Sequence, residues 1–240
     1  MARRILLFKH IIFTVFCVIA FHNQVHSKRI YALRICVKNG FDNSLIKNAQ
    51  ILFDTDSSNV YFTDSLGFVI LDSCTSEIIN YTIKHPLYKD YVGSIYNRKR
   101  KEDVSKHVRI TLKEEFLKDF FQPYYAKSLK EMQHNIELYP DSCFNATFPG
   151  GEKFMKKFFL MYSEYPEKAK ENYDKGKVYA SFIIEKDGHI STIKIIKSVS
   201  TEIDREFKRV IELLPSFIPS FCEGVPVPRE VIWYASFYIN

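Results

Sequence analysis

A hairpin signal near the C-terminus is the feature that most constrains the fold of this chain. Two apolar runs, 177–185 and 189–197, are joined through Asp187-Gly188. An Asp-Gly pair between strand-like runs is typical of a tight hairpin turn, because such turns need residues that tolerate a positive φ. The sequence therefore predicts two antiparallel strands here.

A helix and a third strand are predicted after this hairpin. The helix carries an apolar stripe and ends at Pro215. The final run, 229–239, alternates in character along its length, as a strand with two different faces does. One face holds Val231, Trp233, Ala235, Phe237 and Ile239, and the other Ile232, Tyr234, Ser236 and Tyr238. With a helix at 152–162, this part is predicted to be α+β, with two helices packed on a short antiparallel sheet.

Residues 28–112 differ from this pattern, because they contain many short strand-like runs separated by turn-rich pieces and no helical stretch. Such a pattern predicts a small β-sandwich. Residues 113–145 are charged, with aromatic side chains at loose helical spacing. We expect a helical connector there, broken at Pro123 because proline removes a helix hydrogen bond.

The first 27 residues resemble a signal peptide. Arg3 and Arg4 precede an uninterrupted apolar run, 11–21, which is short for a membrane span, and cleavage is expected after Ser27. The alternative is an uncleaved anchor over 5–21. The formal net charge is +6, and three of these charges lie in this acid-free segment. The remaining +3 is too small to predict nucleic-acid binding.

Four cysteines follow the predicted signal: Cys36, Cys74, Cys143 and Cys222. An even number in an oxidising compartment allows two disulfides, and four cysteines allow three pairings. If each domain closes its own bond, the pairs are Cys36–Cys74 and Cys143–Cys222. The sequence has no C-x-x-C pair, so neither redox catalysis nor a zinc site is predicted.

The C-terminal segment, 146–240, resembles the TonB C-terminal domain. An ordered series of short motifs carries the resemblance, and no single motif is specific. The series comprises Phe148-Pro-Gly-Gly151, Tyr165-Pro166 with Ala169, Gly176-Lys-Val178, Phe182, Asp187-Gly188, Ile190, Asp204, Leu214-Pro215, Phe217, Pro219 and Gly224-Val-Pro-Val227.

The resemblance implies a periplasmic domain that pairs an edge strand with an extended plug or TonB-box segment of an outer-membrane receptor and supports TonB-dependent transport. The candidate edge is 229–239, with Val231, Trp233, Tyr234 and Ser236 as partner-binding residues. Trp233 and Phe237 have an alternative interpretation as core residues. The family also permits a homodimer. Inner-membrane motor proteins would be partners if the N-terminus stays as an anchor.

Two departures from the family pattern weaken the transducer interpretation. The apolar run is short and contains no histidine, since His10 precedes it. The connector is about thirty residues and has few prolines, whereas the family uses a long proline-rich spacer. The alternative function is a structural or scaffold protein of the envelope that binds another envelope protein or a cell-wall polymer.

The first domain resembles a carboxypeptidase regulatory-like or related immunoglobulin-like module. The resemblance rests on Ala49 before Ile51, on the run from Thr63 to Phe68, and on the run from His85 to Tyr88. Such modules are not peptidases. The chain has no nucleophile elbow, phosphate-binding loop, dinucleotide fingerprint or histidine pair at ligand spacing. We therefore expect no enzyme activity, no cofactor and no metal.

Overall fold

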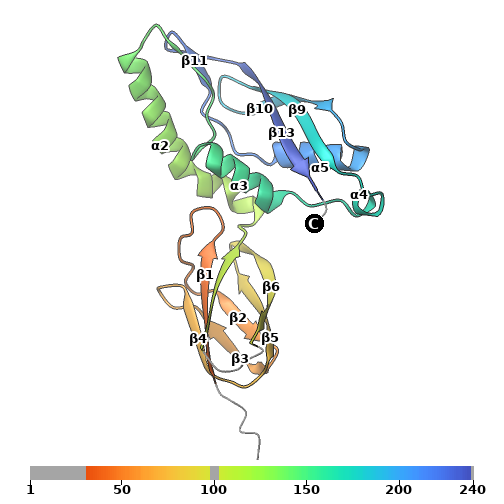
Figure 1. Cartoon of the computed structure of the whole chain (residues 1–240). Coiled ribbons are helices and arrows are strands. Elements are labelled where there is room, and N and C mark those ends of the chain that lie inside the picture. Colours follow the sequence, from red (N-terminus) through yellow and green to blue (C-terminus); the bar gives the residue numbers. More distant parts are fainter. Residues whose placement is uncertain (1–30, 98–102, 239–240) are drawn as a thin grey trace, which may run out of the picture. The chain divides into compact units, whose positions relative to one another are not determined.

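The computed structural model describes residues 31–97 and 103–238, so the predicted signal peptide at 1–27 lies outside the described residues. The chain is α+β and divides into two compact units (Figure 1). The first contains residues up to Val37, Lys47–Ile83 and Val92–Val108. The second contains Lys38–Ile46, Lys84–Tyr91 and Arg109–Asn240.

Two sheets form the first unit, where a small sandwich was expected. One has the strand order β4-β1-β7 and the other β3-β2-β5-β6. The strands are β1 (Tyr31–Asn39), β2 (Gln50–Phe53), β3 (Asp56–Phe62), β4 (Phe68–Cys74), β5 (Ile78–His85), β6 (Tyr88–Tyr96) and β7 (Val104–Ile110). Alternate side chains such as Leu33, Ile51 and Ile79 are buried, which explains the short alternating runs of the sequence.

The connector is a longer element than expected, because it forms one α-helix, α2 (Leu117–Leu138), after a 3₁₀ turn, η1 (Glu114–Phe116). The predicted break at Pro123 is wrong, since this proline lies inside the helix. Phe121 is buried and Tyr124 packs on the Phe154 ring, so contacts on both sides of Pro123 hold the helix together. These contacts offset the cost of proline within a helix, about 3 kcal/mol.

The remaining elements include one antiparallel sheet with the order β10-β9-β13. They are β8 (Cys143–Phe144), α3 (Glu152–Tyr162), α4 (Glu167–Glu171), β9 (Gly176–Ile184), β10 (Ile190–Lys197), α5 (Thr201–Glu212), β11 (Ser220–Cys222), β12 (Val225–Val227) and β13 (Arg229–Phe237). A second small sheet has the order β12-β11-β8. Helix α5 contacts β9 and β10 and buries its apolar stripe.

The core of this unit is rich in aromatic side chains. Phe182 of β9 and Phe207 of α5 are fully buried, and each such burial contributes about 2–3 kcal/mol. A further cluster surrounds Phe41, which is fully buried although it comes from the chain before the connector. Its ring centre lies 5.1 Å from that of Phe121 and 6.1 Å from that of Phe158.

The predicted boundaries at 112/113 and 145/146 therefore divide the chain differently from the structure. Lys38–Ile46 and Lys84–Tyr91 cluster with the C-terminal elements and not with the first sheets. Hydrogen bonds support this grouping: Lys157 Nζ donates to the Phe41 carbonyl at 2.6 Å, and the Tyr162 hydroxyl donates to the Leu112 carbonyl at 2.7 Å.

No helix within 31–97 or 103–238 combines the length and apolar character needed to cross a bilayer.

Candidate strand-pairing site

The last strand, β13, lies at one edge of its sheet. Nine consecutive residues pair with β9 without a bulge, from Arg229 opposite Ile184 to Phe237 opposite Gly176. Among the described residues, no strand pairs with the other edge of β13. A strand edge carries backbone N–H and C=O groups that can accept a further strand. Nine residues at about 3.4 Å each give an edge of roughly 30 Å.

One face of β13 holds the strand on the core. The Trp233 ring lies 5.7 Å from Phe159 of α3 and 5.4 Å from Phe207 of α5, measured between ring centres. Phe237 is buried and contacts Phe159 and Tyr165. Trp233 and Phe237 therefore pack against the core, as their alternative interpretation predicted. On this face of β13, a partner can reach chiefly the backbone.

The opposite face of β13 is open and aromatic. Tyr234 is 51% exposed and stacks on Tyr179 of β9, with ring centres 5.3 Å apart. Lys177 Nζ lies 5.1 Å from the centre of the Tyr234 ring, and Lys197 Nζ lies 5.6 Å from that of Tyr179. Each exposed cation–π contact contributes about 0.5–1 kcal/mol. These contacts form a row of side chains that fixes the ring positions on this face of the sheet. The row consists of Lys177, Tyr234, Tyr179 and Lys197.

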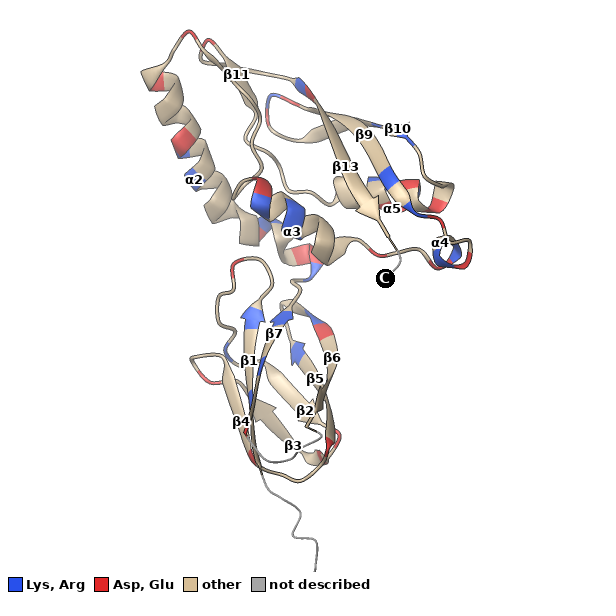
Figure 2. Cartoon of the chain, in the orientation of Figure 1, with Lys and Arg blue, Asp and Glu red and all other residues tan. Residues whose placement is uncertain are grey.

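Helix α3 and strand β9, which both contact β13, carry Lys residues, which Figure 2 colours blue. Lys156 of α3 pairs with Glu152, with its Nζ 2.6 Å from the carboxylate oxygen. Hydrogen bonding to this carboxylate and its negative charge raise the pKa of Lys156. Lys156 thus remains cationic well above neutral pH, as an exposed lysine does.

Two turns place the chain so that β13 can enter the sheet. Gly188 has a φ of +86° in the β9–β10 turn, and its carbonyl accepts a hydrogen bond from the Phe217 N–H at 2.8 Å. The short β11–β12 hairpin then leads directly into β13. At the start of β13, an Arg229 guanidinium nitrogen donates to the Asn145 side-chain oxygen at 2.9 Å.

The four residues predicted to bind a partner lie on this strand but not on one face. Val231 and Trp233 are half-buried on the helix side, whereas Tyr234 and Ser236 are exposed on the open side. Sequence reasoning missed Lys177, Tyr179 and Lys197, which complete the open face. The alternation of Lys177, Tyr179 and Ser181 along β9 was a signal that could have found the first two.

One of the two disulfides considered is present. Cys143 of β8 and Cys222 of β11 lie opposite each other and are bonded, with their Cα atoms 4.1 Å apart. The pairing Cys36–Cys74 is wrong, since both residues are buried thiols. The register explains this: Cys74 lies opposite Tyr31, five residues from Cys36 along β1. That is roughly 16 Å, well beyond the reach of a disulfide.

The titratable groups of this unit do not gather around one reactive point. His189 follows the hairpin turn, and its Nδ1 lies 2.5 Å from Asp187. A hydrogen bond from the His189 backbone N–H and contact with its ring lower the pKa of Asp187. In the described part of the chain, no three His, Cys, Asp or Glu residues are grouped as a metal site requires.

Comparison with known families bears directly on this region. Residues 161–238 match the model of a family described as Gram-negative bacterial TonB protein C-terminal. The C-terminal domain is TonB-like. The matched segment runs from the end of α3 through β13, so it contains the whole three-stranded sheet, α5 and the candidate edge. It does not include Phe148-Pro-Gly-Gly151 or the first unit, for which the carboxypeptidase regulatory-like resemblance stays a prediction.

Solved structures that this chain matches include the Helicobacter pylori TonB C-terminal domain, at 24% identity over 36% of this chain and 79% of that one, with a TM-score of 0.26. A putative membrane-associated protein of unknown function from Bacteroides fragilis is 9% identical over 88% of this chain and 83% of that one, with a TM-score of 0.28. The major pilin subunit BcpA of Bacillus cereus is 9% identical over 34% of this chain, with a TM-score of 0.29, and this chain covers 30% of it. No curated protein matches the sequence.

Proposed function

We propose that this protein is a non-enzymatic component of the cell envelope whose TonB-like domain captures an extended segment of an outer-membrane receptor by strand pairing and supports TonB-dependent transport. The observation that carries the proposal is β13, a nine-residue strand at the edge of its sheet in a domain that matches the TonB C-terminal family.

Strand addition gives such a site its affinity and its selectivity by separate means. An incoming strand gains main-chain hydrogen bonds along the edge whatever its sequence, while side chains beside it discriminate between partners. Here the core contacts of Trp233 hold the edge in place before binding, which lowers the entropy lost on association. The side chains of an added strand would alternate between the two faces of the sheet, so every second one would lie on the same face as Tyr234 and Ser236.

The proposed location is the periplasm. The basic and apolar character of residues 1–27 supports export by a signal peptide, and a TonB-like domain meets outer-membrane receptors on the periplasmic side. The Cys143–Cys222 bond is consistent with an oxidising compartment.

The second candidate function is that of an envelope scaffold without energy transduction. The connector favours it, because α2 has 22 residues and spans about 33 Å as a helix. Its aromatic side chains are engaged in packing, with Phe121 and Tyr124 against Phe154. Such an element lacks the reach of an extended proline-rich spacer.

A titration of the ¹⁵N-labelled chain 28–240 with a peptide from the plug of a receptor of its own source tests the proposal. We expect amide shift changes along β13, with little change along β10. If receptor peptides change no amide shift along β13, the transport role is contradicted and the scaffold function remains.

A pair of proline variants provides the control. Backbone N–H groups of consecutive strand residues point to opposite edges, so only one of Val231→Pro and Ile232→Pro removes a bond to β9. That variant should lose stability, whereas the other should stay folded and lose peptide binding. The side-chain control Ile232→Ala should keep binding within about twofold. A stable proline variant that binds normally would show that the partner does not use this edge.

A further inference from the structure

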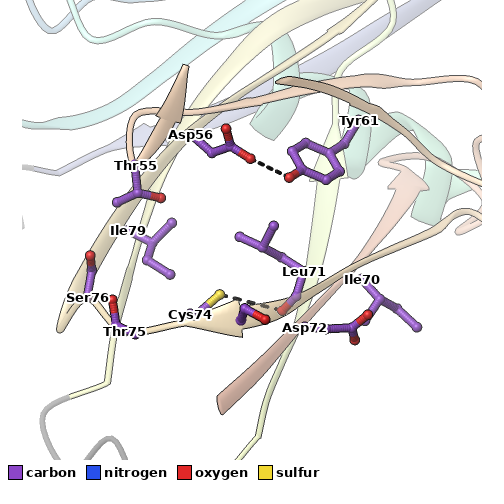
Figure 3. Close-up of a pocket in the computed structure, with 11 residues that line it drawn as sticks. Thr55, Asp56, Tyr61, Ile70, Leu71, Asp72, Cys74, Thr75, Ser76 and Ile79 are labelled. Atoms are coloured by element: carbon purple, nitrogen blue, oxygen red, sulfur yellow. Dashed lines mark hydrogen bonds between the residues drawn. The ribbon is translucent and has the colours of Figure 1, made fainter. Parts of the chain in front are cut away.

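The first unit contains a cavity of about 480 Å³ that is separate from the strand-pairing site (Figure 3). Residues of β3, β4 and β5 and of the adjoining turns line it: Thr55, Asp56, Tyr61, Ile70, Leu71, Asp72, Ser73, Cys74, Thr75, Ser76 and Ile79. The volume lies within the usual range of ligand sites, about 300–1,000 Å³.

The strands beside this cavity are both edge strands. β3 ends one sheet and β4 ends the other, and in the described chain neither has a strand on its outer side. We call this side of the unit the β3–β4 seam. Ile70 of β4, which lines the cavity, is 45% exposed, whereas Val60 and Phe62 of β3 lie on the outer face of their sheet, opposite Tyr61. Natural proteins usually protect sheet edges with charges, proline or a covering element, and exposed apolar groups here leave the edge attractive to another strand.

The cavity is acidic. Asp56 accepts hydrogen bonds from the Tyr61 hydroxyl at 2.5 Å and from the Asn59 amide at 3.0 Å. The bond from Tyr61, and then that from Asn59, lower the pKa of Asp56, so this carboxylate is charged at neutral pH. Asp72 adds a second, exposed carboxylate, and the described lining contains no lysine, arginine or histidine.

The remaining lining suits the stem of a long basic side chain. Leu71 and Ile79 supply apolar surface, and the hydroxyl groups of Thr55, Ser73, Thr75 and Ser76 supply polar partners. Lysine and arginine bury their methylene stems on apolar surface while the charged end meets a carboxylate. A cationic side chain gains an attraction to these two carboxylates that a neutral ligand lacks.

We propose that the β3–β4 seam binds an extended peptide and that the cavity takes one lysine or arginine side chain of that peptide. The flanking strand edges favour a peptide over a free amine, because only a peptide can also pair its backbone with one of these edges. This inference does not depend on the function proposed for β13, since every residue that carries it lies in the first unit.

The test uses the ¹⁵N-labelled chain 28–240 and a seven-residue peptide of alternating threonine and valine with a central lysine. We expect shift changes in β3 and β4 amides, leaving β13 amides unchanged. The same peptide with norleucine in place of lysine should bind at least tenfold more weakly, because norleucine keeps the stem and removes the charge. Affinity for the lysine peptide should fall as salt is raised.

Two matched variants complete the test. Asp72→Asn removes an exposed lining carboxylate and should weaken the binding of the lysine peptide about three- to tenfold. Asp54→Asn makes the same charge change outside the lining and should alter affinity less than twofold. Equal binding of the norleucine peptide, or unchanged affinity of Asp72→Asn, would overturn the proposal. So would n-butylamine binding as tightly as the peptide, since the seam would then take free amines and not strands.

Discussion

At the scale of single residues, Gly188 shows how local sequence and tertiary packing fix the same position. Its φ of +86° lies in the region that disfavours L side chains, and a Cβ atom there would lie 1.9 Å from the Phe217 carbonyl oxygen. Turn conformation alone explains why glycine suits this hairpin. The close approach of Phe217 adds a second reason, which no local pattern contains.

We therefore predict that Gly188→Ala lowers the free energy of unfolding by about 2–4 kcal/mol, through strained φ plus overlap with backbone. Gly224→Ala is the matched control, because its φ is +74° and its nearest neighbour, Ile136, would lie at 3.6 Å, an ordinary contact. It should cost about 1–2 kcal/mol. Urea denaturation measures both variants. Equal losses would mean that the Phe217 backbone moves away freely.

The candidate site was predictable in part at this scale. The period-2 pattern of 229–239 placed Trp233 and Phe237 on one face and Tyr234 on the other, as found, because a strand turns successive side chains to opposite sides. The row that includes Tyr179 and Lys197 was not predictable, because it depends on which strands are neighbours and in which register. Register is set by tertiary packing as well as by the turn.

At the scale of elements, the β9–β10 hairpin and α3, α5 and β13 were predictable, since each has a strong period and a clear stop signal, whereas the β11–β12 hairpin was not predicted. Pro123 shows the limit of such reasoning. Proline disfavours a helix interior, yet α2 continues through it because Phe121 and Tyr124 gain tertiary contacts on either side. Local propensity is a weak prior where packing opposes it.

The Cys143–Cys222 bond joins β8 to β11 and closes a loop of 79 residues in sequence separation. By loop-closure entropy, replacing both cysteines with serine should lower the free energy of unfolding by about 4 kcal/mol. Urea denaturation with and without a reductant measures this. The native chain should lose a similar amount on reduction, whereas the double variant should not respond, because Cys36 and Cys74 are thiols. A reductant effect in the double variant would contradict that assignment.

At the scale of the whole molecule, the boundaries of the units could not be found from composition. The segment around Phe41 lies between strands of the first unit, but its side chain is buried among the rings of α2 and α3. Nothing in the local pattern of Asn39-Gly40-Phe41 shows this, because a turn next to a bulky aromatic residue fits an exposed loop equally well. Contacts far apart in sequence decided where the second unit begins.

The N-terminus decides whether the molecule can transduce energy itself or acts only as a periplasmic binder or scaffold. Because the apolar run 11–21 is shorter than the roughly twenty residues that span a bilayer, we expect cleavage after Ser27. Mass spectrometry of protein from the native envelope, with fractionation, should find a chain beginning at Lys28 in the periplasmic fraction. Such a chain has no direct link to an inner-membrane motor and would act as a binder or scaffold. A chain that keeps 11–21 and fractionates with the inner membrane would contradict this expectation and favour a transducer. The 33 Å length of α2 would then limit how far β13 could extend toward a receptor.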